Sequence, residues 1–291
     1  YPPDPASKGS CTIGGNLAEC AGGPRALKYG VTRDYVTGVR AVLPNGETIK
    51  SGGRLLKNST GYSLTQLLIG SEGTLAVITE ITLKLIPLPA CNITLLAPFE
   101  TPEDAAGALN AVFMRRIVPC AAEFMDRQAV EAAQDMLGKA FPGGPAGALL
   151  LLQLDGNDTD LLARDAERTG ETLLEGGALD VLVADSSAKQ NELWDLRRSA
   201  GEAVKKISAY KEEDTVVPRA KLPALVRTLK EISARHGLTT ICYGHAGDGN
   251  LHANVIRGDM PEQKWRGELP GTLAEIHREV VAMGGMISGE H

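Results

Sequence analysis

Apolar runs bounded by turn formers predict most of the strands of this chain. Residues 36–50 carry apolar positions on both sides of the turn sequence PNG, which predicts two strands joined in a hairpin. Residues 74–86 are β-branched and aliphatic, and residues 148–154 read ALLLLQL, so both predict buried strands. A second hairpin is predicted over residues 238–257, where the turn formers GDGN separate two strand-like runs.

After residue 89 the pattern changes to strands that alternate with longer helices, and we place a domain boundary there. The sequence TPED at residues 101–104 is a strong helix start, with an N-cap, a proline in the first turn and two acids. A short helix ended by Gly70 is predicted within residues 61–73. Further strands are predicted at 92–97, 117–124, 179–184 and 214–217, and helices at 101–115, 127–138, 158–175, 187–207, 219–235 and 262–284. Antiparallel strands covered by helices indicate the α+β class.

The first 35 residues are rich in glycine and proline but still carry apolar residues such as Ile13, Leu17 and Val31. Glycine at this density allows close backbone approach and positive φ angles. Exposed backbone N–H groups can then cradle a phosphate or a large planar cofactor. A flexible linker is the alternative, but linkers lack such apolar residues, so we favour the cradle.

Composition narrows the class of partner. The 291 residues suggest about two domains, and 43% hydrophobic with 23% charged residues is typical of globular proteins. The net charge of −6 and an aromatic content of 4% argue against nucleic acid as a partner. No apolar run approaches the ~18 residues of a membrane span.

The cysteines indicate a reducing compartment. They are odd in number and include no CxxC pair, which is typical of unpaired thiols in a cytoplasmic protein. The chain begins without a start methionine or signal peptide and stops directly after a helical stretch. We therefore expect an excerpt of a longer protein, from which targeting signals can have been removed.

Common cofactor and catalytic signatures are absent. No GxGxxG follows a strand, and no GxxxxGK[ST], HExxH or correctly spaced GxSxG occurs. The stretch DGNDTD at residues 155–160 has an aspartate where a calcium loop requires glycine, so we interpret it as a helix cap.

The second hairpin brings candidate site residues together. His245 ends its first strand and His252 begins the next, and residues paired at a hairpin mouth lie close to each other. Asn254 is two residues from His252 and shares its face. With an acidic third ligand from elsewhere, two histidines suit a divalent metal with open positions. A polar turn with surface histidines is the alternative, and these residues alone do not decide between them.

Three other places hold ionic groups that burial would make functional. Arg197 lies early in a helix and could point inward to hold a carboxylate by two hydrogen bonds, although the residues alone favour an exposed helix arginine. Lys211 stands where a helix gives way to a strand, with the same alternative. Glu290 and His291 are adjacent, so in an extended segment one can face a metal while the other faces a substrate.

Six segments carry a family resemblance, and they occur in the order IGGNLAECAGG, KYGVTRDYVTGV, LLIGSEGTLAVITEITLKLIPLP, LWDLR, YGHAGDGNLHANV and SGEH. Together they resemble the FAD-linked 2-hydroxy-acid dehydrogenases and oxidases of the vanillyl-alcohol-oxidase (VAO) type. Glycolate oxidase flavoprotein subunits, D-lactate dehydrogenases and D-2-hydroxyglutarate dehydrogenases are the similar members. The resemblance spans nearly the whole chain, and the segments GSEGTL and GHxGDGNLH are specific to it.

The resemblance implies an α+β fold in two parts. Residues 1–89 would be the second subdomain of a VAO/PCMH-type FAD-binding domain. Residues 90–291 would be an antiparallel-sheet substrate (cap) domain of the FAD-linked oxidase C-terminal type. The family's first Gly-rich phosphate-binding segment and the tail after the final histidine are not among these residues, so we expect a chain truncated at both ends.

The resemblance also implies contacts to FAD, many of them through the backbone. These contacts fall on Pro3, Asp4, Ser7, Ile13, Gly14, Gly15, Asn16, Gly22, Gly23, Gly30, Glu72, Gly73 and Ile78. Cys20 stands where the family often has asparagine, and a thiol cannot replace the hydrogen bonds of an amide.

By the same resemblance, His245, His252 and Glu290 would ligate a divalent metal, with zinc first and manganese or iron as alternatives. His291 would act as the general base, for which an ordinary imidazole pKa of about 6.5 is suitable.

Arg197 and Lys211 would bind the substrate carboxylate, and Asn254 would orient the substrate. The implied reaction oxidises a D-2-hydroxy acid, glycolate or D-lactate, to the 2-oxo acid, with hydride passing to FAD and the metal lowering the pKa of the hydroxyl. Two alternatives stay open: a D-2-hydroxyglutarate dehydrogenase, or a non-catalytic subunit that keeps the fold.

The partners implied are a small 2-hydroxy acid and an electron acceptor, which is a flavoprotein, an iron–sulfur subunit or a quinone. We expect no nucleic acid partner. If the protein is oligomeric, we expect a homodimer. We expect it to be cytoplasmic, either free or peripheral to the inner membrane.

Overall fold

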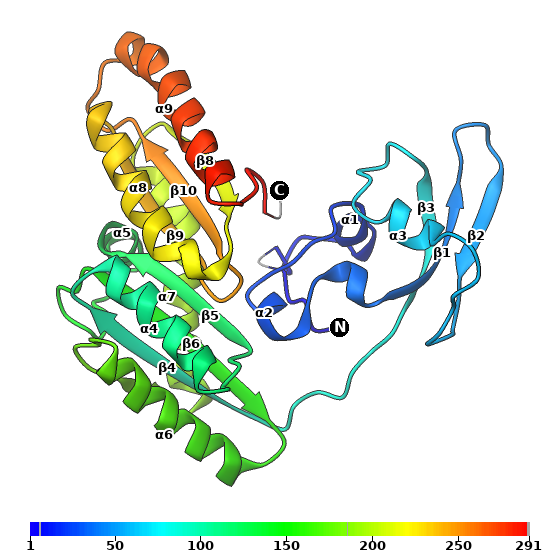
Figure 1. Ribbon diagram of the computed structural model, residues 1–291, viewed down its shortest axis with the longest axis horizontal. Coiled ribbons are helices and arrows are strands. Elements are labelled where there is room, and N and C mark those ends of the chain that lie inside the picture. The colour runs from blue at the N-terminus through cyan, green and yellow to red at the C-terminus, as the bar shows by residue number, and fades with distance from the viewer. Residues whose placement is uncertain (6, 185, 290–291) are drawn as a thin grey trace. The chain divides into compact units, whose positions relative to one another are not determined.

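A computed structural model describes residues 1–5, 7–184 and 186–289 of the chain. The described residues form two compact units, which divide between Leu88 and Pro89 (Figure 1, blue to cyan and cyan to red). Each unit has its own sheet and its own hydrophobic core. No helix among the described residues combines the length and the apolar character needed to cross a membrane.

The smaller unit is built on a three-stranded antiparallel sheet in the order β2-β1-β3. β1 (Val36–Val42) and β2 (Thr48–Gly52) form the predicted first hairpin, and β3 (Val77–Leu83) pairs with the other edge of β1. Three short helices complete the unit: α1 (Ile13–Ala18), α2 (Ala26–Tyr29) and α3 (Leu64–Leu68), with a 3₁₀ turn at Thr32–Asp34.

The prediction of a buried strand over residues 74–86 is wrong in its burial. β3 is shorter, and none of its residues is fully buried; Val77 is 66% exposed. The core of this unit is small and gathers around Leu17, Val39 and Leu68, so it covers the sheet only in part. Ile78 and Ile81 of β3 pack against that core as partly buried residues. Apolar composition therefore predicts the strand here but not the extent of its burial.

The larger unit is built on a seven-stranded antiparallel sheet in the order β7-β4-β6-β5-β9-β10-β8. Its strands are β4 (Cys91–Phe99), β5 (Ala121–Asp126), β6 (Ala148–Gly156), β7 (Leu182–Ala184), β8 (Tyr210–Val216), β9 (Thr239–His245) and β10 (Asn250–Ile256). Its helices are α4 (Pro102–Met114), α5 (Arg127–Leu137), α6 (Thr159–Glu175), α7 (Ser187–Ile207), α8 (Leu222–Arg235) and α9 (Glu262–Ala282).

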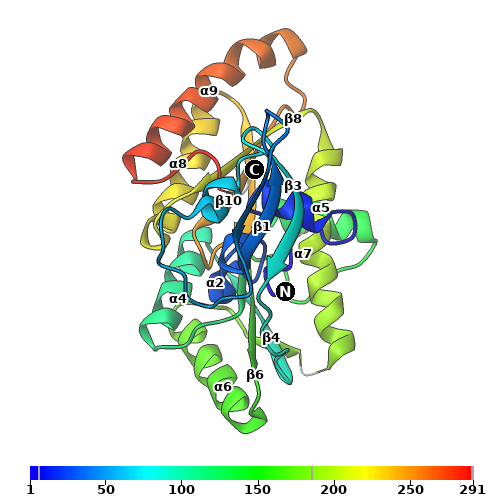
Figure 2. The same ribbon diagram turned by 90° about the vertical axis from the view of Figure 1, so that its right-hand side faces the viewer.

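The helices cover both faces of this sheet. α5 and α7 lie on one face, and α4, α6, α8 and α9 lie on the other (Figure 2). Under α5 and α7 the core includes Met125, Leu151 and Leu196, all of which are buried. The α+β class is confirmed.

Helix and strand boundaries follow the sequence with two notable differences. Thr101 caps α4 through the N–H of Asp104, as its sequence predicts. The strand predicted at 214–217 instead spans Tyr210–Val216, because β8 pairs with β10 along its whole length although its sequence, YKEEDTV, is highly charged. The helix predicted at 219–235 begins with a 3₁₀ turn at Arg219–Lys221 before α8.

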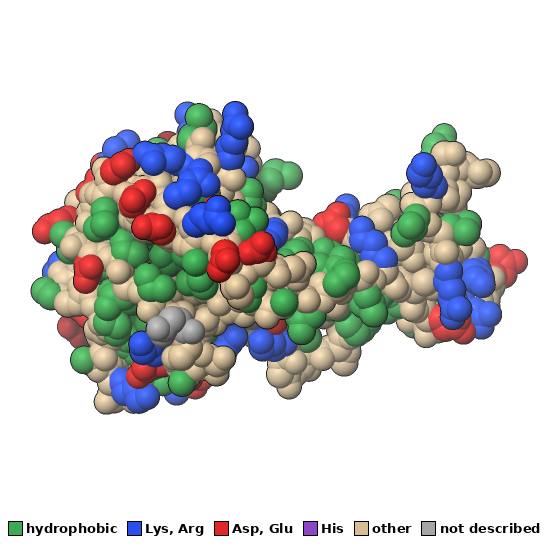
Figure 3. All heavy atoms as spheres, turned by 90° about the horizontal axis from the view of Figure 1, so that it is seen from below, with side chains coloured by type: hydrophobic (Ala, Val, Ile, Leu, Met, Phe, Trp, Pro, Cys, Tyr) green, Lys and Arg blue, Asp and Glu red, His purple; other side chains and the backbone are tan. Residues whose placement is uncertain are grey.

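The face of the larger unit seen in Figure 3 carries acidic and basic side chains interspersed with hydrophobic ones, and no single-sign patch dominates it.

His236 makes the packing of α8 against α9 sensitive to pH. Its Nδ1 lies 3.1 Å from Oε2 of Glu268, and its Nε2 lies 3.2 Å from Oε2 of Glu275. The hydrogen bond to Glu268 raises the pKa of His236 above its ordinary value of 6.5, against the effect of desolvation and with help from Glu275. Stability from this contact is therefore complete below about pH 6.5 and lost as pH rises through the raised pKa.

We accordingly expect the His236→Gln variant to be less stable than the parent chain at about pH 6, with the difference shrinking toward about pH 8.5. Thermal unfolding of both proteins across this range measures it. A stability difference that stays constant with pH would contradict the assignment.

Candidate active site

The second predicted hairpin is present as β9 and β10. Gly249 lies at its turn with a φ of 84°, and a Cβ there would be 2.1 Å from the carbonyl oxygen of Val217. Only glycine fits this position. Pairing of His252 with Tyr243 and of Asn250 with His245 sets the register. The side chains of His245, His252 and Asn254 consequently share one face of the sheet.

His245 and His252 lie side by side and are almost completely buried, with 4% and 6% of their surface exposed. Their ring centroids are 5.6 Å apart, with the rings nearly perpendicular. Nδ1 of His245 lies 2.8 Å from Oε1 of Glu123, and Nδ1 of His252 lies 3.3 Å from Oδ1 of Asp214. Each imidazole therefore has a carboxylate within 3.3 Å of its Nδ1, and the contact of His245 with Glu123 has hydrogen-bonding geometry.

Glu123 joins His245 to Arg197. It is fully buried on β5, and its Oε2 accepts a hydrogen bond from Nε of Arg197 at 2.7 Å. Burial alone would raise the pKa of Glu123, but the charges and hydrogen bonds of His245 and Arg197 outweigh it and hold the pKa below its ordinary value. Sequence reasoning missed this residue. The signal was a single glutamate within the apolar run from Ile117 to Met125.

The two histidines fit part of the predicted metal site. Metal-binding histidines commonly hold a carboxylate at one ring nitrogen, which fixes the ring so that the other nitrogen ligates. Within residues 1–5, 7–184 and 186–289, no group of three or more histidine, cysteine or acidic residues could hold a metal. The predicted third ligand, Glu290, and the predicted base, His291, lie outside the described residues. The metal therefore stays a prediction.

Asn254 is the most unusual polar residue of this face. It is fully buried, and neither polar atom of its amide has a hydrogen-bond partner among the described residues. It lies near the hydroxyl of Tyr243 but not in hydrogen-bonding geometry. Burial without a partner costs roughly 1–3 kcal/mol for such a group. A buried amide in this state suits the recognition of a polar ligand atom.

Tyr243 links Arg197 to β8. The guanidinium carbon of Arg197 lies 5.3 Å from the centroid of the Tyr243 ring, and the Tyr243 hydroxyl donates to Oε1 of Glu212 at 3.3 Å. Burial and the nearby charge of Glu212 raise the pKa of Tyr243 strongly, so its hydroxyl stays protonated and able to donate.

Lys211 is not brought together with Arg197, and this prediction needs correction. In the register of β8 with β10, Lys211 lies opposite Val255, on the face of the sheet away from His252 and Asn254. Its Nζ lies 3.5 Å from Glu213, which also contacts Nε2 of His277 on α9. Adjacent residues of a strand point to opposite faces, so it is the next residue, Glu212, that faces the site.

The predicted FAD contacts lie in the smaller unit. Pro3, Asn16, Gly22 and Gly23 are buried, Asp4, Gly30 and Ile78 are half-buried, and Ser7, Ile13, Gly14, Gly15, Glu72 and Gly73 are exposed. Asp4 and Glu72 have positive φ angles of 47° and 51°. Such backbone strain costs about 1–3 kcal/mol and gathers at functional sites, which fits a cofactor-binding segment. Cys20 also has a positive φ, and its Sγ accepts a hydrogen bond from Nε of Arg33 at 3.2 Å.

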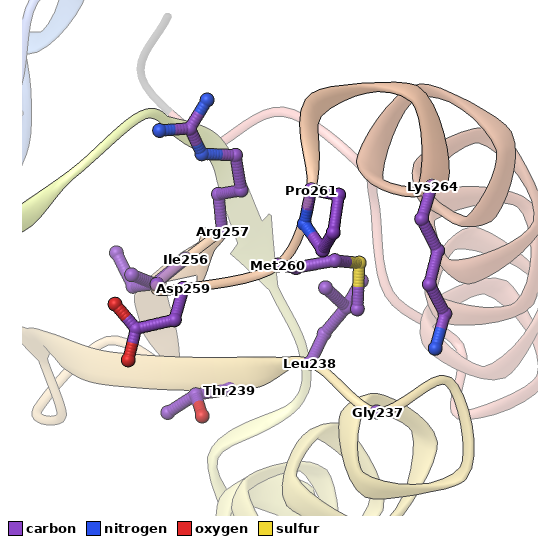
Figure 4. Close-up of a pocket in the computed structure, with 10 residues that line it drawn as sticks. Gly237, Leu238, Thr239, Ile256, Arg257, Asp259, Met260, Pro261 and Lys264 are labelled. Carbon is purple, nitrogen blue, oxygen red and sulfur yellow. The ribbon is translucent and has the colours of Figure 1, made fainter.

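A pocket of about 470 Å³ lies elsewhere in the larger unit, at the other end of the hairpin. It is lined by residues 237–239 and 256–261 and by Lys264, whose side chains are drawn in Figure 4. None of the residues predicted to act in catalysis or to bind a metal lines it. The buried polar face of β9 and β10 is therefore the better candidate for chemistry.

Two family models match the chain. Residues 88–291 match the C-terminal domain of FAD linked oxidases, and residues 1–52 match an FAD binding domain. The whole polar face described above falls within the first match.

Curated relatives and solved structures are similar over nearly the whole chain. The D-lactate dehydrogenase of Anaerostipes hadrus is 42% identical, and the glycolate oxidase subunit GlcD of Bacillus subtilis (strain 168) is 38% identical; each alignment covers 100% of this chain and 62% of the relative. The chain thus spans less than two thirds of these relatives. An alkyldihydroxyacetonephosphate synthase structure matches with a TM-score of 0.70 at 20% identity, over 99% of this chain and 56% of that one. At 20% identity, the similarity to this synthase structure supports the fold only.

Proposed function

Because this chain belongs to the family of FAD-linked oxidases, of VAO/PCMH-type fold, we propose that it is part of a flavoprotein that oxidises a D-2-hydroxy acid to the 2-oxo acid. Glycolate and D-lactate are the substrates we favour. The observation that carries the proposal is the buried row of Arg197, Glu123 and His245 on the same face of the sheet as the Asn254 amide, which lacks a hydrogen-bond partner among the described residues. Burying polar groups this deeply costs free energy, which favours a role for them in binding or catalysis.

Each residue of this face has a role in the proposed reaction. Arg197 binds the substrate carboxylate, and the contact with Glu123 leaves its planar fork oriented, since that bond uses Nε alone. Glu123 also fixes the ring of His245. Asn254 meets a polar atom of the substrate and gains the hydrogen bonds that its buried amide lacks.

Two bound groups complete the proposal. FAD, when bound, supplies the hydride acceptor. His245 and His252, with Glu290, would hold a divalent metal, zinc first, whose chemistry at this position is Lewis acidity. His291 stays the predicted base and lies outside the described residues.

The remaining assignments are part of the same proposal. Residues 1–89 contribute to the FAD-binding domain, and residues 90–291 form the substrate domain. The electrons leave to a flavoprotein, an iron–sulfur subunit or a quinone. The protein is cytoplasmic or peripheral to the inner membrane, with a homodimer as the oligomeric option.

Anaerobic flavin reduction tests the proposed function. We expect D-lactate or glycolate to bleach the flavin absorbance of the full-length, flavin-loaded protein, and L-lactate to leave it unchanged. Bound flavin that no 2-hydroxy acid reduces would refute the function. A full-length protein that binds no flavin would favour the non-catalytic alternative.

A further inference from the structure

Glu212 is the residue of β8 that extends the polar face to the edge of the sheet. The register puts it directly opposite Asn254, and two residues along the strand from Asp214. Side chains directly opposite each other on paired strands have Cβ atoms about 4.5–5.5 Å apart. A carboxylate therefore stands beside the buried amide of Asn254, at the end of the face away from Glu123.

Two donors from different elements hold the Glu212 carboxylate. The Tyr243 hydroxyl donates to Oε1 at 3.3 Å, and Nζ of Lys205 on α7 lies 2.9 Å from Oε2. The side chain is about three quarters buried, with 23% of its surface exposed. Its position is therefore defined by contacts on both sides rather than by a flexible surface conformation.

Helix α7 lies along this face and places one basic residue near each end of the face. Arg197 contacts Glu123, and Lys205, eight residues later, contacts Glu212. Gly201 lies midway, where a Cβ would be only 3.2 Å from the Tyr243 hydroxyl. Residues spaced by four share a helix face, so the helix presents two cations to two carboxylates across a gap without a side chain.

The two ends of the face differ in what they can bind. At one end the Arg197 guanidinium has N–H groups beyond Nε, in the fork geometry that suits a carboxylate. At the other end Lys205 is already neutralised by Glu212. A second carboxylate on a substrate would meet the Glu212 carboxylate there rather than a free Lys205 ammonium, and this juxtaposition of like charges disfavours its binding.

We propose that Glu212 is a specificity-determining residue that restricts the substrate to 2-hydroxy acids with a single carboxylate. This inference rests on the proposed function. The methyl group of lactate and the hydrogen of glycolate carry no charge toward Glu212. A 2-hydroxy dicarboxylate such as D-2-hydroxyglutarate brings its second carboxylate against Glu212 and is rejected by repulsion.

The test compares D-lactate with D-2-hydroxyglutarate in the full-length, flavin-loaded protein. Glu212→Gln keeps the shape of the side chain, removes its charge and releases Lys205. We expect kcat/KM for D-2-hydroxyglutarate to rise about tenfold or more, with kcat/KM for D-lactate changed less than about threefold. Adding Lys205→Met should remove only the part of the gain that attraction by the released ammonium supplies, and leave the part that comes from the lost repulsion. Glu202→Gln removes the same charge from an exposed pair on α7 and should change neither value.

The outcomes distinguish a failure of this inference from a failure of the proposed function. A ratio of the two kcat/KM values that Glu212→Gln leaves unchanged overturns the inference, as does a parent protein that oxidises both acids equally well. Both results leave the proposed function standing. Flavin that neither acid reduces overturns the proposed function as well. If the glutamine variant folds poorly, Glu212→Ser makes the same change of charge, and the same change in the ratio of the two kcat/KM values is expected for it.

Discussion

Replacing Glu123 by alanine should lower the free energy of unfolding of the larger unit by about 3–5 kcal/mol, because removing one partner of a buried ion pair leaves the other uncompensated. Glu123 has no exposed surface and contacts both Arg197 and His245. Without it, Arg197, which is only 8% exposed, and the imidazole of His245 both lose the carboxylate that they contact. The penalty therefore exceeds the worth of any single hydrogen bond.

Tryptophan fluorescence during urea denaturation measures this effect. Both tryptophans of the chain, Trp194 and Trp265, are buried in the larger unit, so the signal reports on that unit alone. Glu175→Ala is the matched control, because it breaks the exposed pair with Arg115 in the same unit and should cost at most about 1 kcal/mol. If the two variants lose the same stability, the buried cluster is not held as described.

Replacing His252 by alanine should remove the metal and almost all turnover of the full-length, flavin-loaded protein. We expect a loss of at least about a hundredfold in kcat, since Lewis acidity contributes several kcal/mol and each 1.36 kcal/mol is tenfold in rate. Metal content measured by mass spectrometry should fall from one ion per chain to near zero. This second measurement separates loss of the metal from a general loss of catalysis.

His277→Ala is the control for this substitution. His277 contacts Glu213 on the other face of β8, away from His252, so its removal should leave both metal content and turnover near those of the parent. His252→Gln keeps more of the packing against Tyr243 and checks that a loss of turnover does not reflect misfolding. Normal metal content and normal turnover in both His252 variants would exclude the metal assignment.

Local sequence was enough to predict the hairpin that carries the two histidines. The turn formers and the flanking apolar runs determine both strands, and alternation then puts His252 and Asn254 on one face. Glu123 could not be joined to them in this way. Its partners Arg197 and His245 are 74 and 122 residues away in sequence, and only the packing of α7 on the sheet and the pairing of β5 with β9 bring them together.

The error at Lys211 has a specific physical origin. In a strand the side chains alternate with a period of two, so a shift of one residue exchanges the two faces. The charged sequence YKEEDTV has no apolar alternation to indicate which residues face inward, and β8 is long because its backbone pairs with β10. Register was needed to assign Glu212 to the site and Lys211 to the opposite face.

Because β8 lies at the edge of the sheet, substitutions on it should be tolerated more easily than substitutions on the inner strands. Apart from isolated bridges to Met286 and Ser288, it pairs with β10 only, whereas β9 and β10, which carry the histidines, each have a strand on both sides. A substitution on β8 therefore disturbs fewer neighbours than one on the inner strands. If Glu212 restricts the substrate as we propose, substrate preference can change by single substitutions at position 212 while the histidines of the inner strands stay in place, and one scaffold could then serve a series of related acids.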